Sequence, residues 1–95
     1  RKVRVIEQID LALPQLLKLK PDVIVVTGDH STPALLKGHS WHPVPLLLYS
    51  QWCRHDKTKE FSESASASGG LGRLCATDIM PLAMANGLKL TKFGA

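Results

Sequence analysis

The sequence lacks the features that mark secreted, membrane-spanning and nucleic-acid-binding proteins. Only two of its 95 residues are cysteines, Cys53 and Cys75, too few for a disulfide framework. No apolar run approaches the roughly 20 residues that span a bilayer, and residues 1–10 lack the apolar stretch of a signal peptide. Aromatic residues make up 5%, and the twelve Lys and Arg residues form no stripe. We therefore expect a cytoplasmic protein with reduced thiols that binds neither membranes nor nucleic acid.

The length and composition of the chain are typical of one globular domain at most. Hydrophobic residues make up 44% of the chain and charged residues 21%, which argues against disorder. The formal net charge of +4 suits a small anionic substrate. The chain begins without Met and inside a helical pattern, so we interpret Arg1 as a cut end.

The hydrophobic pattern predicts an α/β fold. Apolar residues between positions 3 and 19 recur at helical spacing, and Pro14 predicts either a kink or the first turn of a second helix. The run VIVV at 23–26 predicts a strand buried on both faces, as in a parallel sheet with helices on either side. Residues 43–50 predict a second strand.

The second half of the chain alternates between polar and apolar segments. Residues 55–73 predict a mobile surface loop, and 76–87 predict a short helix with Thr77 or Asp78 as its N-cap. Residues 88–93 fit a last short strand. Two or three strands cannot complete a sheet whose central strand is apolar on both faces, so we expect part of a larger α/β domain.

The most informative stretch is TGDHSTPALLKGHSWHPVP, residues 27–45, which holds three of the four histidines. In open α/β sheets, binding sites lie beyond the carboxyl ends of the strands. Asp29 and His30 occupy that position, and Gly28 permits the turn that aims both at one point. A carboxylate and an imidazole suit Mn²⁺, Zn²⁺ or Co²⁺.

Other interpretations of this stretch stay open. A loop could return His39 or His42 to the Asp-His pair, or Asp29 could cap a short helix that begins around residues 31–33, with His30 exposed beside it.

The later segments offer weaker candidates for a site. The residues Cys53, His55 and Cys75 could hold a structural zinc ion, or Cys53 could act as a nucleophile with His55 as its base. GGLGR at 69–73 lacks the spacing of a phosphate-binding loop and fits a flexible hinge. Arg73 nevertheless carries a guanidinium that could reach a substrate phosphate.

Three segments together resemble a known family: TGDHSTP, GHSWHPVPLLL and GGLGRL…DIMPLAMANGLKLTKFGA. They are similar to the C-terminal end of the archaeal-type cofactor-independent phosphoglycerate mutases, within the alkaline phosphatase superfamily. The resemblance covers essentially the whole chain. It implies that residues 1–95 form the C-terminal part of a metal-binding domain, with no complete second domain. That domain would be an α/β/α sandwich with a mainly parallel sheet.

The resemblance also implies roles for individual residues. Asp29 and His30 match the pair that binds one metal ion, and His39 matches a ligand of the other ion. His42 is predicted to be a supporting residue. The resemblance assigns no role to Arg73, which stays a weak candidate for substrate binding on the chemistry of its guanidinium alone. The expected cofactors are two divalent ions, Mn²⁺ first and Mg²⁺, Co²⁺ or Zn²⁺ as alternatives, without 2,3-bisphosphoglycerate.

The implied activity is the interconversion of 3-phosphoglycerate and 2-phosphoglycerate through a phosphoserine, a step of glycolysis and gluconeogenesis. In such proteins the nucleophilic serine, a first aspartate and a further Asp-His pair lie upstream, and this chain has no counterpart of them. Ser31, Ser40 and Ser50 do not match the nucleophile's context. We therefore expect the isolated chain to be inactive and the missing upstream part of the same protein to be its partner.

Two rival interpretations remain at this point. The chain could belong to another metal-dependent phosphatase of the superfamily or to a phosphopentomutase. It could also be a small metal-binding or interaction module that is complete as it stands. Such a module predicts a closed metal site and cooperative unfolding of the isolated chain.

Overall fold

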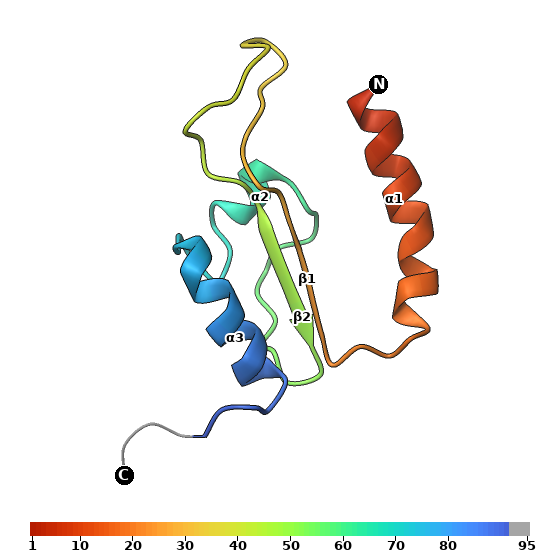
Figure 1. Cartoon of the computed structure of the whole chain (residues 1–95), viewed down its shortest axis with the longest axis vertical. Coiled ribbons are helices and arrows are strands. Elements are labelled where there is room, and N and C mark those ends of the chain that lie inside the picture. Colours follow the sequence, from red (N-terminus) through yellow and green to blue (C-terminus); the bar gives the residue numbers. More distant parts are fainter. Residues whose placement is uncertain (92–95) are drawn as a thin grey trace.

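The structure, a computed structural model, describes residues 1–91 of the chain (Figure 1). The chain contains both helices and strands, as expected of an α/β protein. The elements in chain order are α1 (Lys2–Leu17), β1 (Val23–Thr27), β2 (Leu46–Ser50), α2 (Glu63–Ser66), the 3₁₀ helix η1 (Ala76–Asp78) and α3 (Ile79–Asn86).

Helix α1 is continuous through Pro14, so the first segment forms one helix instead of two. The Lys18 amide donates to the Pro14 carbonyl at 3.2 Å, which extends the helical bonding past the proline. Val3, Ile6 and Ile9 are each more than half exposed, although they lie on the apolar face that the spacing predicts. In Figure 1, α1 stands beside the two-stranded sheet. The apolar side chains of α1 remain exposed to solvent.

The two strands form an antiparallel pair, in which Val23 lies opposite Ser50 and Thr27 opposite Leu46. The parallel neighbours expected for β1 are not found among residues 1–91. The apolar run correctly indicated a strand, but such a run only favours parallel neighbours and does not fix the direction of the strand that pairs with it. The β1 residues Val23–Val26 are half-buried in this chain.

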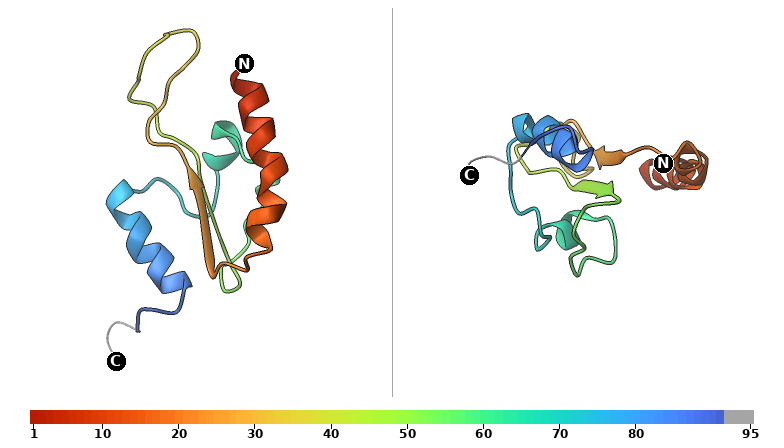
Figure 2. Two further views of the ribbon diagram at one scale, coloured as in Figure 1. Left: turned by 45° about the vertical axis from the view of Figure 1, so that its right-hand side comes forward. Right: turned by 90° about the horizontal axis from the view of Figure 1, so that it is seen from below.

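Helix α3 packs against β1, and η1 leads directly into α3 (Figure 2). The prediction of a helix over 76–87 is confirmed, with Asp78 as the N-cap residue and Gly87 as the C-cap. The Ser50 hydroxyl donates to the Asn86 side-chain oxygen at 2.9 Å, which ties the end of β2 to the end of α3. The sheet and α3 therefore form one unit.

The segment predicted as a mobile loop, 55–73, contains the short helix α2. The Ser62 hydroxyl caps it by accepting from the Ala65 amide at 3.1 Å. No strand forms over residues 88–91, so that prediction is wrong for its first four positions. The remaining positions of that predicted strand, 92 and 93, lie outside the described residues.

Residues 1–91 form no closed hydrophobic core. None of their hydrophobic side chains is buried, and the two buried polar residues are Ser31 and Ser50. The radius of gyration is 15.1 Å, against about 12 Å for a compact domain of this length. Apolar faces of this kind are normally covered by a further layer of secondary structure. None of the helices in residues 1–91 combines the length and the apolar character needed to cross a bilayer.

Candidate metal centre

The three clustered histidines lie on residues 28–45, which we call the histidine loop, between the carboxyl end of β1 and the start of β2. A backbone bridge pairs Ser31 with Ser40, and the Ser40 amide donates to the Ser31 carbonyl at 3.0 Å. This bridge folds the loop back on itself, so that residues nine apart in sequence become neighbours. Residues 34–37 form turns, and the short helix considered for this segment does not form.

Asp29 and His30 are in direct polar contact on the exposed surface of the loop. His30 Nε2 lies 3.2 Å from Asp29 Oδ2, and the His30 amide donates to Asp29 Oδ1 at 2.9 Å. The Asp29 side chain is 85% exposed and that of His30 is 43% exposed. Two donor atoms that each lie about 2.1 Å from the same ion are themselves roughly 3 Å apart. The separation of His30 Nε2 and Asp29 Oδ2 is similar, so the pair fits a chelating role.

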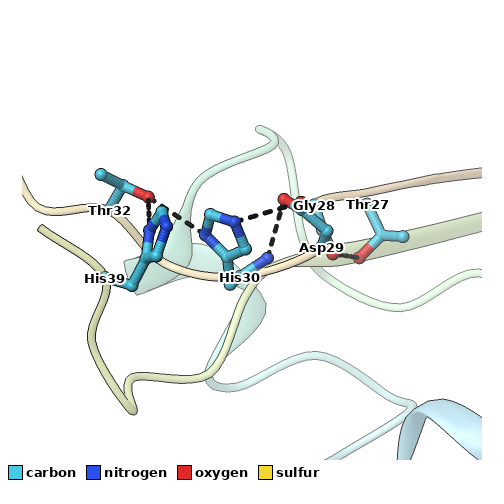
Figure 3. A network of polar contacts seen from close by, with 6 residues as sticks. All are labelled: Thr27, Gly28, Asp29, His30, Thr32 and His39. Carbon is cyan, nitrogen blue, oxygen red and sulfur yellow. Dashed lines mark hydrogen bonds and ion pairs between the residues drawn. The ribbon is translucent and has the colours of Figure 1, made fainter.

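His30 and His39 are joined through Thr32 (Figure 3). The Thr32 hydroxyl oxygen lies 3.1 Å from Nδ1 of His30 and 3.1 Å from Nδ1 of His39. The two ring centroids are 3.8 Å apart, with the planes tilted by 53°. The loop therefore gathers the three predicted ligands Asp29, His30 and His39 in one place.

The third clustered histidine, His42, makes different contacts. Its Nδ1 lies 2.8 Å from the Ser40 hydroxyl, and its ring stacks on Trp41 with centroids 4.8 Å apart. These contacts fit the supporting role predicted for His42.

The donor atoms present fit part of a metal site. Within residues 1–91, no three His, Cys, Asp or Glu side chains are arranged to hold one ion. An Asp-His chelate with a separate histidine fits two incomplete coordination shells better than one closed shell. The stand-alone module is disfavoured on this ground, because it requires a closed site and a buried core.

The alternative zinc site is not assembled in the described part of the chain. Cys53 and Cys75 are both free thiols. The Cys53 thiol donates to the Ser50 carbonyl at 3.2 Å. His55 does not join the two cysteines in a metal-binding group among residues 1–91.

An open groove of about 1420 Å³ runs from the histidine loop to residues 51–75, which we call the serine-rich loop. Asp29, His30 and Arg73 all contribute to its lining. The guanidinium predicted to bind a phosphate therefore shares a groove with two of the predicted metal ligands, whereas the third, His39, does not line it.

Asp56 organises the serine-rich loop, a role that the sequence patterns did not indicate. Its two carboxylate oxygens accept from the Thr58 amide and from the Gly70 amide, each at 2.8 Å. The bond to Gly70, followed by the bonds to Thr58, lowers the pKa of the Asp56 carboxyl below its usual value of 3.8. The Asp-x-Thr spacing is a signal for the nearer bond, but the contact with Gly70 depends on the fold of the whole loop.

Comparison with known proteins identifies the family. The profile of the Metalloenzyme superfamily matches residues 1–86. The chain belongs to this superfamily. Its metalloenzyme relatives include proteins named "Probable 2,3-bisphosphoglycerate-independent phosphoglycerate mutase" from Thermotoga neapolitana (54% identical), Deinococcus radiodurans (57%) and Thermus thermophilus (52%).

Each of these alignments covers 94 residues, or 99% of this chain, but only 23% of the relative. The chain therefore spans about a quarter of the length of the curated relatives it matches. It is also similar to the solved structure of the PH0037 protein from Pyrococcus horikoshii, with a TM-score of 0.72 and 48% identity. That superposition covers 77% of this chain and 22% of the other.

Proposed function

We propose that this chain is the C-terminal metal-binding segment of a cofactor-independent phosphoglycerate mutase. The observation that carries the proposal is 52–57% identity, over 99% of the chain, to relatives with that name. The full-length protein would interconvert 3-phosphoglycerate and 2-phosphoglycerate through a phosphoserine, without 2,3-bisphosphoglycerate. Because this is a glycolytic step, its place is the cytoplasm.

Each predicted ligand has a defined role in this proposal. Asp29 and His30 hold one divalent ion, and His39 contributes to a second. Mn²⁺ is the preferred ion, since it accepts both carboxylate oxygen and imidazole nitrogen, and Mg²⁺, Co²⁺ or Zn²⁺ are alternatives. When bound, such ions neutralise phosphate oxygens and lower the pKa of a nucleophilic hydroxyl.

The groove beside these ligands is the proposed substrate site. Arg73 lines it together with Asp29 and His30. A guanidinium binds phosphate oxygens in a bidentate manner, and the net charge of +4 favours an anionic substrate. His42, hydrogen-bonded to Ser40, supports the wall of the same groove.

The remainder of the full-length protein completes both the fold and the site. We propose that it supplies the nucleophilic serine and the other ligands, and that it covers the exposed apolar face of α1. β1 is paired on one edge, with β2, among the described residues. Its other edge offers a place for a further strand of the mainly parallel sheet in an α/β/α sandwich.

Activity of the full-length protein tests this proposal. We expect conversion of 3-phosphoglycerate to 2-phosphoglycerate without added 2,3-bisphosphoglycerate, loss of turnover after chelation, and recovery with Mn²⁺. The isolated 95-residue chain should show no turnover. Turnover by the isolated chain, or release of inorganic phosphate or pentose phosphate as the main product of the full-length protein, would contradict the proposal.

A further inference from the structure

The hydrogen bonds of Thr32 restrict how its two neighbouring histidines can bind metal. A threonine hydroxyl has one proton to donate and two lone pairs to accept with. Two of these three positions face ring nitrogens here, because Nδ1 of His30 and Nδ1 of His39 each lie 3.1 Å from the same oxygen. The same hydroxyl thus contacts ligands assigned to two different ions.

The protonation of each ring follows from which nitrogen binds the ion. A neutral imidazole carries one N–H, and its ligating nitrogen must be free of a proton. The His30 Nε2 atom lies on the side of the Asp29 carboxylate, 3.2 Å from Oδ2, whereas Nδ1 is directed to Thr32 (Figure 3). Chelation with Asp29 therefore uses Nε2 of His30 and leaves the proton on Nδ1.

We propose that Thr32 is a positioning residue that accepts an Nδ1–H bond from both His30 and His39. These two bonds fix the tautomer and the ring orientation of each histidine, with both Nε2 atoms available to the ions. This inference rests on the metal sites of the proposed function and adds a shared support for them. Hydrogen bonds of this kind to ligating histidines typically contribute about 10- to 100-fold to metal affinity.

The local backbone supports a specific role for this side chain. Thr32 is half-buried and directly follows the buried Ser31, whose bridge to Ser40 holds the two sides of the loop together. The hydroxyl is therefore held by the backbone between the two rings, without depending on a long flexible side chain.

Metal titration of the full-length protein tests the inference. Thr32→Val keeps the shape of the side chain and removes the hydroxyl, whereas Thr32→Ser keeps the hydroxyl. We expect the Mn²⁺ dissociation constant to rise by about 10- to 100-fold in Thr32→Val and to stay within about threefold of wild type in Thr32→Ser. Thr77→Val, at an exposed threonine of η1, is the matched control and should leave it unchanged.

A second measurement reads the tautomers directly. In full-length protein loaded with Zn²⁺ and labelled with ¹⁵N at histidine, both His30 and His39 should carry their proton on Nδ1. A proton on Nε2 of either ring would overturn the inference, as would unchanged Mn²⁺ affinity in Thr32→Val. Equal losses in Thr32→Val and Thr32→Ser would overturn it too, since the hydroxyl would then not be responsible.

These measurements are independent of the assay for the proposed function. If the wild-type protein fails to interconvert phosphoglycerates but Thr32→Val still weakens Mn²⁺ binding, the proposed activity fails and the role of Thr32 stands. If turnover is normal and the histidine spectra contradict the expected tautomers, the inference about Thr32 fails alone.

Discussion

The histidine loop and the serine-rich loop are both stabilised by polar contacts, but the groups that make these contacts differ. Neither loop has a buried apolar side chain to hold it, and in each loop one short polar side chain contacts two other groups of the same loop. Thr32 is linked to two imidazole rings, while Asp56 is linked to two backbone amides. The first arrangement leaves ring nitrogens and a carboxylate available to a ligand, and the second commits its carboxylate to the loop itself.

This difference separates residues that bind a ligand from residues that shape the groove around it. Asp29 is 85% exposed at the groove and accepts one backbone amide, that of His30, whereas both oxygens of the Asp56 carboxylate accept backbone amides. A carboxylate near a groove is therefore a poor guide to a metal site until its own hydrogen bonds are known. The two aspartates provide the sharpest test of the contrast.

The largest expected effect is that of Asp29→Ala in the full-length protein. Loss of the chelating carboxylate should reduce mutase turnover by at least about 1000-fold, because a catalytic ion contributes several kcal/mol to the transition state. Metal content and the rate of 2-phosphoglycerate formation measure this. Asp22→Ala, at an exposed aspartate just before β1, is the control and should retain normal activity. Equal activity in the two variants would remove Asp29 from the metal site.

The next effect distinguishes two histidines of the same loop. His39→Ala should weaken Mn²⁺ binding by about 100-fold or more, as expected for loss of a direct ligand, whereas His42→Ala should weaken it by about tenfold at most. Titration of the metal-free full-length protein with Mn²⁺ measures both values. The reverse order of effects would show that the assignment of these residues is wrong.

A smaller effect is expected where Asp56 is replaced. Asp56→Ala removes the acceptor of the Thr58 and Gly70 amides, so exchange of the Gly70 amide hydrogen should accelerate by roughly tenfold. Asp56→Asn retains one oxygen acceptor and should show a smaller acceleration. Hydrogen exchange followed by NMR or mass spectrometry measures this, and Mn²⁺ affinity should not change in either variant. A loss of Mn²⁺ affinity would mean that Asp56 also serves the metal site.

The smallest effect is a pH dependence of the same contact. The folded-state pKa of Asp56 is lowered, so its contribution to stability is fully present above the usual pKa of 3.8. That contribution is lost as the pH falls through the lowered folded-state pKa. The Gly70 amide chemical shift should therefore titrate below pH 3.8, and the step should vanish in Asp56→Asn. A midpoint above 3.8 would contradict the hydrogen-bonding pattern.

The local pattern of the sequence predicted most of the elements but not how they pair. Helical spacing predicted α1, start and stop signals predicted α3, and the β-branched run predicted β1, because these signals are local. The direction of pairing between β1 and β2 depends on the path of the intervening loop, which no periodicity records. The α2 helix was missed because four residues are too few to show a period, although Ser62 followed by Glu63 is an N-terminal signal.

The candidate site, too, could be predicted only in part from the sequence. Asp29 and His30 were predicted from their place at the end of a strand. His39 was assigned as a ligand from the family resemblance, and Arg73 was suggested by the chemistry of its guanidinium. The contribution of Thr32 could not be predicted, because it depends on the Ser31–Ser40 bridge that brings His39 back to His30. Which ion each ligand holds remains a prediction that the metal titrations address.

The Ser31–Ser40 bridge also predicts how the proposed metal sites would release their ions. Opening of this bridge separates Thr32 from His39 and frees the segment that carries His30, so one local fluctuation disturbs ligands assigned to both ions. If the proposed assignment of the ligands holds, we expect the two ions to leave at a common rate set by the opening of the turn. The Ser40 amide, which donates to Ser31 at 3.0 Å, reports that opening rate.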